Sequence, residues 1–368
     1  MFSEEIKKYD RDLIKDKIYS ATKTDVEISL GKEKRTLEDF LNLISPAAIN
    51  YLEEMAAISN KTTQKRFGKT VQLYIPLYLS NICENNCVYC GFSSSNKIKR
   101  TILSKDEILK EVEILKSYGY EHILLVAGEA PKKVGVDFYL ETIELIKPYF
   151  SQICIEVQPL EQDEYKQLID AGLNSVYVYQ ETYHKGNYSS YHPSGKKADF
   201  DFRVNTPDRL GNAGIHKIGL GVLLGLEDWR IDSAFTALHL GYLEKKYWRS
   251  KFSISFPRLR PHVGSFDPQY PISDKELVQL ICAYRLLDEE LELSMSVRES
   301  PTFRDNIIKL GITSMSAGSK TEPGGYAAQN EALEQFEVHD DRTPAEICNM
   351  IKRQGYEAVW KDWDNILQ

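Results

Sequence analysis

The chain has 368 residues, of which 42% are hydrophobic and 27% charged, as in an ordinary globular protein. Its 46 basic and 54 acidic residues give a formal net charge of -8, which argues against broad affinity for nucleic acids or membrane surfaces. The N-terminus lacks an apolar signal segment, and no apolar run approaches the roughly 18 residues of a membrane span, so we expect a cytoplasmic protein.

Residues 1–70 are predicted to form a helical extension, because the stretch from Arg35 to Phe67 places apolar residues at helical spacing. After it, short β-branched or aromatic runs alternate with amphipathic stretches. The eight predicted strands are 71–79, 122–127, 152–158, 175–180, 216–224, 251–256, 291–297 and 312–317. The predicted helices between and after them lie near 104–120, 137–149, 162–171, 205–213, 229–242, 273–288 and 300–310.

This alternation places the chain in the α/β class and predicts a parallel (β/α)8 TIM-type barrel over residues 71–320. An open sheet with fewer strands is the alternative. Residues 321–368 are predicted to be a C-terminal segment packing on the barrel. Within it, Thr343, Pro344 and Glu346 occupy the N-cap, first and third positions of a terminal helix that Gly355 would end.

Three cysteines follow the first predicted strand in the spacing C-x3-C-x2-C, at Cys83, Cys87 and Cys90. A structural zinc site needs four ligands, and no second cysteine pair supplies them. An iron–sulfur cluster suits thiolates, and three ligands to four irons leave one iron open for a substrate or cofactor. The remaining cysteines (Cys154, Cys282 and Cys348) are isolated, which fits a reducing compartment better than a disulfide framework.

With Tyr89 before the last cysteine, this motif resembles the signature of the radical S-adenosyl-L-methionine (SAM) superfamily. The resemblance implies a 4Fe-4S cluster on Cys83, Cys87 and Cys90, whose open iron binds SAM and whose electron cleaves it to a 5′-deoxyadenosyl radical. It also implies SAM contacts from residues at or near strand ends, as barrel sites require. The implied contacts are Tyr89, Ala127, Gly128, Glu129, Glu156, Gln180, Glu181, Arg203, Val222 and Leu224.

Individual roles follow from the same resemblance. The residues 127–129 are similar to a G-G-E motif whose acceptors bind the SAM amino group, and Arg203 matches a cation for the SAM carboxylate. Gln180 and Glu181 would contact the ribose, and the aliphatic residues after 220 the adenine. Glu156 would bind SAM or substrate, with simple turn capping as the alternative.

The chain is similar to the ThiH family of radical SAM tyrosine lyases, which are the 2-iminoacetate synthases of thiamine thiazole biosynthesis. The similar segments follow the same order along nearly the whole chain, from the cysteine loop through "SFPRLRP" and "SKTEPGGY" to "HDDR". The resemblance implies hydrogen abstraction from the amino group of L-tyrosine and Cα–Cβ cleavage to 2-iminoacetate (dehydroglycine) and p-cresol. Either Arg258 or Arg260 would anchor the substrate carboxylate, and Ser319 would help to orient it. The implied partners are thiazole synthase (ThiG) and a low-potential flavodoxin or ferredoxin.

Three alternatives remain. A hydrogenase-maturation tyrosine lyase shares the barrel but has a further C-terminal cysteine cluster, whereas only Cys348 follows Cys282 here. A radical SAM lyase could act on another aromatic amino acid. A non-catalytic iron–sulfur carrier would need no SAM-binding residues such as Arg203. The loop from His184 to Lys197 is either a lid or partner surface or simply solvated.

Overall fold

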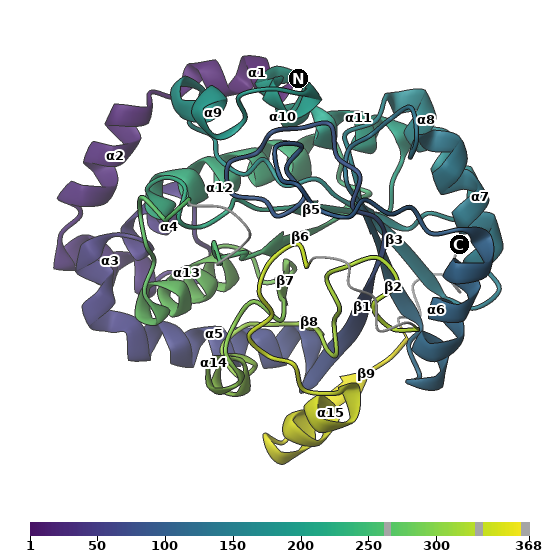
Figure 1. The fold of residues 1–368 in the computed structure, drawn as a ribbon. Coiled ribbons are helices and arrows are strands. Elements are labelled where there is room, and N and C mark those ends of the chain that lie inside the picture. Colours follow the sequence, from purple (N-terminus) through teal and green to yellow (C-terminus); the bar gives the residue numbers. More distant parts are fainter. Residues whose placement is uncertain (261–265, 328–333, 362–368) are drawn as a thin grey trace.

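The computed structural model describes residues 1–260, 266–327 and 334–361 (Figure 1). Eight parallel strands pair in sequence order, and β1 also pairs with β8 through Leu73 and Met315, which closes the barrel. This confirms the predicted (β/α)8 barrel and excludes the open sheet. The strands are β1 (Thr70–Ser80), β2 (His122–Ala127), β3 (Gln152–Glu156), β4 (Ser175–Tyr177), β5 (Lys217–Leu220), β6 (Lys251–Ser255), β7 (Glu292–Met295) and β8 (Ser314–Ser316).

Alternation along β1 shows how the barrel is filled. Leu73, Ile75 and Leu77 are fully buried in the main hydrophobic core, whereas Tyr74 and Tyr78 on the opposite face line a cavity inside the barrel. Successive side chains of a strand point to opposite faces, so the apolar set packs against the outer helices. The tyrosines and serines of the other set leave a polar interior at the carboxyl end of the strands.

Helices cover the outside of the barrel in the order that the periodicity predicts (Figure 1). The Ser104–Glu107 and Thr343–Glu346 pairs both form capping boxes, which satisfy backbone N–H groups at the two helix starts. The covering helices are α6 (Lys105–Ser117), α7 (Val136–Ile146), α8 (Gln162–Ala171), α11 (Thr206–Ala213), α12 (Trp229–Lys246), α13 (Asp274–Leu287), α14 (Pro301–Ile307) and α15 (Pro344–Arg353).

Helices also occupy residues 2–67, and in Figure 1 they run along one side of the barrel in purple and blue. The last of them packs against α13, and its Ser59 hydroxyl donates to the Leu310 carbonyl at 2.5 Å. The elements are α1 (Phe2–Glu5), η1 (Ile6–Lys8), α2 (Arg11–Ser20), α3 (Lys23–Leu30), α4 (Leu37–Leu43), η2 (Pro46–Tyr51) and α5 (Leu52–Phe67). A domain boundary at residue 70 stays a prediction.

Two parts of the fold differ from the prediction. A ninth strand, β9 (Glu357–Val359), pairs with the start of β1 through Glu357 and Thr70, and three residues are too few to show a period of two. The predicted loop 184–197 contains α9 (Lys185–Tyr191) and η3 (Lys196–Ala198), and α10 (Phe200–Val204) follows. Several strands also end earlier than predicted, because their last residues turn into loops around the cavity.

The predicted C-terminal segment includes 328–333 and 362–368, which lie outside the described residues. Its described part joins the barrel through β9 and covers it with α15 (yellow in Figure 1). No helix among the residues described here is both long and apolar enough to cross a membrane.

Candidate active site

The three clustered cysteines lie in the loop between β1 and α6, and all of them line the cavity at the carboxyl end of the barrel. Arg100 shapes this loop: its guanidinium donates hydrogen bonds of 2.6–3.1 Å to four backbone carbonyls between Asn81 and Asn96. One cation thus replaces the sheet hydrogen bonds that an irregular loop lacks. The loop holds Cys83, Cys87 and Cys90 as free thiols against a single cavity.

This arrangement fits a cluster better than a single ion. In the described part of the chain, no three His, Cys, Asp or Glu side chains converge on one ion position. A four-iron cluster takes each thiolate on a different iron, so its ligands do not need to converge. Burial raises the pKa of the Cys87 thiol to about 12, and metal coordination deprotonates such a thiol outright.

The predicted A-G-E segment packs directly on the cysteine loop. The Gly128 N–H donates to the Ser80 carbonyl at 3.0 Å, and the Glu84 N–H donates to the Glu129 carbonyl at 2.8 Å. A Cβ atom on Gly128 would lie 2.3 Å from the Ile82 carbonyl oxygen, so only glycine allows this approach. Ala127, Gly128 and Glu129 all line the cavity.

Glu181 is the centre of a buried charge cluster at the end of β4. Its Oε1 lies 2.6 Å from Lys197 Nζ and 3.6 Å from Arg203 Nη2. The Arg203 Nε also donates to the Tyr179 carbonyl at 2.7 Å. Although burial alone would raise the pKa of Glu181, these cations hold it below its usual value. Glu181 has a φ of 69°, a rare conformation for a residue with a side chain and one typical of functional sites.

Tyr89 lies beside the cluster loop and is fixed by His192. The His192 Nδ1 lies 2.9 Å from the Tyr188 carbonyl, so it carries the proton, and Nε2 accepts from the Tyr89 hydroxyl at 2.7 Å. Burial lowers the pKa of His192 to about 3, which keeps the ring neutral. Tyr89 packs with Cys87 and Leu223 in a small apolar cluster facing the cavity.

Two arginines line the opposite side of the cavity, Arg260 and Arg298. Arg260 Nη2 pairs with Glu299 at 3.0 Å. Arg298 stacks on Phe336 with its guanidinium carbon 3.4 Å from the ring centroid. Among the described residues, the one hydrogen-bond partner of its guanidinium nitrogens is the Arg258 carbonyl at 3.4 Å. Most donors of Arg298 are therefore available to an anion, and arginine binds a carboxylate through two such donors.

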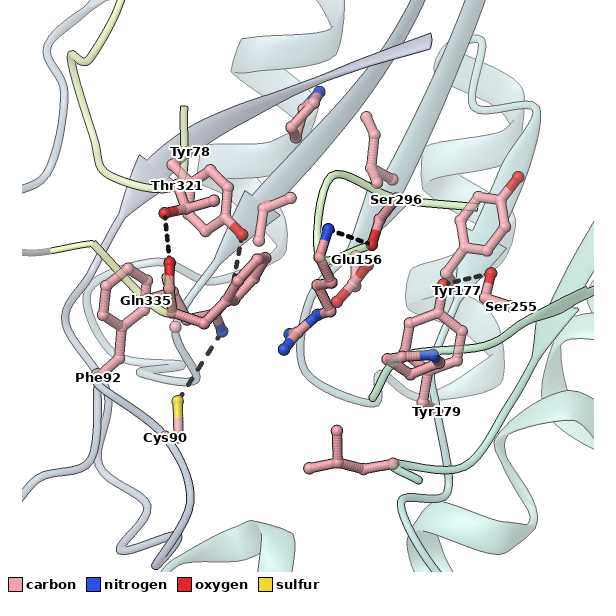
Figure 2. Close-up of a pocket in the computed structure, with 18 of the residues that line it drawn as sticks. Tyr78, Cys90, Phe92, Glu156, Tyr177, Tyr179, Ser255, Ser296, Thr321 and Gln335 are labelled. Carbon is pink, nitrogen blue, oxygen red and sulfur yellow. Dashed lines mark hydrogen bonds between the residues drawn. The ribbon is translucent and has the colours of Figure 1, made fainter. Parts of the chain in front are cut away.

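Glu156 lies in the middle of the cavity, between the Tyr78 side and the Tyr179 side (Figure 2). It remains accessible to water in the open cavity, yet its depth in the barrel raises its pKa to about 7. Arg298 is the largest influence in the opposite direction. Ser319 also lines the cavity, and its hydroxyl is buried without a hydrogen-bond partner among the described residues.

Gln335 brings the C-terminal segment to the cysteine loop, as Figure 2 shows. Its side-chain oxygen accepts from the Tyr78 hydroxyl at 2.8 Å, and its Nε2 donates to the Cys90 sulfur at 3.8 Å. The Gly91 N–H donates to the Gln335 carbonyl at 3.3 Å. This side chain thus contacts a predicted cluster ligand from 245 residues away.

Most predicted site residues lie around one cavity. Those that line it are Cys83, Cys87, Tyr89, Cys90, Ala127, Gly128, Glu129, Glu156, Glu181, Arg203, Arg260 and Ser319.

Four predicted site residues lie outside the cavity lining. Val222 and Leu224 belong to the main core, and the intervening Leu223 lines the cavity. Gln180 is buried, and both of its amide atoms lack partners in the described part of the chain. Arg258 pairs with Glu299 and, at 2.8 Å, with Asp274.

Several cavity residues had no predicted role. Asn85 donates to Glu129 at 2.6 Å and accepts from the Lys197 N–H at 2.9 Å, so it joins the cysteine loop to η3. Lys197 comes from the predicted loop and faces inward instead of being solvated. Arg298 follows β7, and its position directly after a predicted strand indicated a site residue as clearly as the position of Arg258 did.

Comparisons with known proteins agree with this geometry. Residues 77–238 match the family model of the radical SAM superfamily, and residues 255–357 match the biotin and thiamin synthesis associated domain. The chain is 50% identical to the 2-iminoacetate synthase of Escherichia coli (strain K12), over 100% of this chain and 97% of that protein. It is 48% identical, with the same coverage, to the 2-iminoacetate synthase of Salmonella typhimurium.

Among solved structures, the fold is similar to HydG, a maturase of the FeFe-hydrogenase, with a TM-score of 0.90 and 32% identity. The match covers 95% of this chain and 80% of HydG. The similarity therefore includes the N-terminal helices and the barrel together.

Proposed function

Because this chain belongs to the 2-iminoacetate synthases of the radical SAM superfamily, we propose that it cleaves the Cα–Cβ bond of L-tyrosine to 2-iminoacetate and p-cresol. It is a carbon–carbon lyase, and its product supplies the thiazole moiety of thiamine. The observation that supports the residue assignments below is the convergence of three free thiols, a buried Glu181–Lys197–Arg203 cluster and two arginines on one cavity.

Cys83, Cys87 and Cys90 hold the 4Fe-4S cluster in this proposal. When bound, the cluster and SAM supply a 5′-deoxyadenosyl radical, with methionine as the second product. Arg203 binds the SAM carboxylate, since it is a buried cation with donors left over after its bond to the Tyr179 carbonyl.

The remaining predicted SAM contacts divide according to their placement. Residues 127–129 present backbone acceptors and a carboxylate to the SAM amino group, and Glu181 lies where a ribose hydroxyl would bind. Leu223 and Tyr89 provide the apolar wall that adenine requires. Gln180, Val222 and Leu224 do not line the cavity, so in this proposal they support the apolar wall from behind.

Arg298 and Arg260 anchor the carboxylate of tyrosine. Both line the cavity, but Arg260 is paired with the Glu299 carboxylate, whereas the partner of the Arg298 guanidinium among the described residues is a neutral carbonyl. Arg258 forms ion pairs with Asp274 and Glu299, and Glu299 also pairs with Arg260, so Arg258 helps to position Arg260 through this shared carboxylate. Anchoring the carboxylate fixes the amino group, which is needed because the reacting atoms must be held in near-attack geometry.

The proposal includes two protein partners and a compartment. 2-Iminoacetate hydrolyses readily, so direct delivery to thiazole synthase (ThiG) is the route that we propose. The electron comes from a low-potential flavodoxin or ferredoxin. The reducing cytoplasm is the compartment that keeps six cysteines free.

The test is anaerobic reconstitution with iron and sulfide, followed by SAM, reductant and L-tyrosine. We expect 5′-deoxyadenosine and p-cresol, and both should be lost when Cys83, Cys87 or Cys90 is changed to alanine. The matched control is Cys282→Ala, since Cys282 is buried in the main core and does not line the cavity. Deoxyadenosine without p-cresol would contradict the tyrosine assignment, and release of carbon monoxide or cyanide would favour the hydrogenase-maturation reaction.

A further inference from the structure

Glu156 and Arg298 are two opposite charges that line one cavity from opposite sides of the barrel, at the end of β3 and after the end of β7. Among the described residues, none donates a hydrogen bond to the Glu156 carboxylate. Arg298 likewise keeps most of its donors available. Two partly buried charges that are not fully paired with the protein are costly unless water or a ligand completes them. The α-carboxylate and α-ammonium of an amino acid have the matching signs.

We propose that Glu156 accepts a proton from the α-ammonium of bound tyrosine and so prepares the neutral amine that the radical attacks. This inference rests on the proposed tyrosine lyase function. It assigns to Glu156 a catalytic role on the substrate, whereas the sequence left open whether this residue binds SAM or substrate.

The proton balance is simple. The N–H bond of the ammonium breaks, its proton moves to a Glu156 carboxylate oxygen, and the electron pair stays on nitrogen. The neutral amine then retains two N–H hydrogens, one of which is abstracted. No oxidant or reductant is needed for the proton transfer, and the radical is the one that the proposed activity already supplies.

The surroundings of Glu156 suit a base. Tyr74 and Tyr78 of β1 and Tyr179 after β4 surround it without charge, because burial holds their pKa values above the usual one. The charged groups that act on it are Arg298 after β7, Glu181 after β4, Lys197 in η3 and Arg203 in α10.

Burial outweighs the three cations, so the Glu156 pKa rises to about 7. The α-amino group of a peptide has a pKa of about 8, and the carboxylate of free tyrosine raises this value further, so a base with a raised pKa is better matched to it than an ordinary carboxylate. A surface glutamate, with a pKa of about 4.3, would be a much weaker base. Glu156 is ionised above its own pKa, so the base form is lost as the pH falls below about 7.

The experiment uses the reconstituted full-length protein and compares wild type with Glu156→Gln, Glu156→Asp and a matched control, Glu141→Gln, on the exposed face of α7. Iron content and SAM binding are measured first and should be equal in all four. Tyrosine dissociation constants are then measured against pH without reductant, followed by p-cresol formation with reductant.

For wild type we expect tyrosine affinity and p-cresol formation to fall together below about pH 7. For Glu156→Gln we expect p-cresol formation to be about 10²–10³-fold lower at pH 7, with the deficit shrinking as pH rises because the free amine then forms without a base. Glu156→Asp should restore part of the rate and the acid limb.

Two results would overturn the inference while leaving the proposed function intact. One is a Glu156→Gln enzyme with the wild-type rate and pH profile. The other is a deficit that is the same at every pH, which would make Glu156 a positioning residue only. A wild-type protein that neither binds tyrosine nor forms p-cresol would contradict the proposed function and the inference with it.

Discussion

Gly128→Ala is the smallest change that should disturb the cluster loop. Gly128 lies at the end of β2, where its backbone passes directly under Ile82 and Cys83. A Cβ atom there would lie 2.3 Å from the Ile82 carbonyl oxygen and 3.1 Å from Cys83 Cβ. The nearest obstacle is backbone, so no side-chain rotation can relieve the overlap.

The expected magnitude follows from that overlap. Ordinary contacts of a Cβ atom begin near 3.4 Å, so the loop must move by about 1 Å to accept the methyl group. Overpacking of this kind costs about 1–3 kcal/mol of unfolding free energy. Because the moved segment carries Cys83, a shift of about 1 Å should also reduce the reaction rate by about 10²-fold.

Thermal unfolding of the apo-protein measures the loss of stability. The rate of p-cresol formation, compared at the measured iron content per chain, measures the effect on the reaction. The matched control is Gly241→Ala in α12, where nothing lies within 4 Å of the new Cβ atom. That control should be more stable than wild type by about 0.5–1 kcal/mol, as expected for Gly→Ala inside a helix. A Gly128→Ala protein with wild-type melting temperature, iron content and p-cresol formation would refute the steric reasoning.

Three further predictions concern single side chains. Arg298→Met should raise KM for tyrosine by about 10-fold or more, because a charge-assisted hydrogen bond contributes about 1.5–3 kcal/mol, while SAM binding measured by equilibrium dialysis stays unchanged. Gln335→Leu removes the N–H···S hydrogen bond to Cys90. The cluster midpoint potential should then fall by about 40 mV, which is the one-electron equivalent of a hydrogen bond of about 1 kcal/mol. A redox titration followed by electron paramagnetic resonance measures this shift. Burial lowers the pKa of His239 from 6.5 to about 3, so the folded state loses stability as the pH falls below 6.5. His239→Asn should remove this loss: when the unfolding free energy is measured with denaturant at several pH values, its slope against pH below 6.5 should decrease by up to about 1.4 kcal/mol per pH unit.

Local signals were sufficient for the barrel and for placing most of the predicted site residues around its cavity. Each of the eight predicted strands is a short run with apolar, aromatic or β-branched residues, and the cysteine loop and the A-G-E segment follow the first two strands directly. Strand ends meet at one face of a parallel barrel, so residues such as Arg203 and Arg260 reached the cavity as expected.

The cavity residues that the sequence did not predict are positioned by contacts between distant parts of the chain. Gln335 reaches Cys90 across 245 residues, and Lys197 lies inward where Asn85 accepts its backbone N–H and Glu181 pairs with its ammonium group. No periodicity or spacing carries such information. Val222 and Leu224 face the core because the chain after β5 exposes Leu223 to the cavity, a one-residue offset that reverses the side-chain direction.

The measurement closest to the central claim is the origin of the hydrogen in 5′-deoxyadenosine. The reaction is run with the reconstituted wild-type protein, SAM, reductant and L-tyrosine in deuterated water, where hydrogens on nitrogen and oxygen exchange and carbon-bound hydrogens do not. Deuterium in the deoxyadenosine, formed together with p-cresol, is the predicted result, because the radical takes a hydrogen from the tyrosine nitrogen held between Arg298 and Glu156. Unlabelled deoxyadenosine would show abstraction from carbon and would contradict this account of the site.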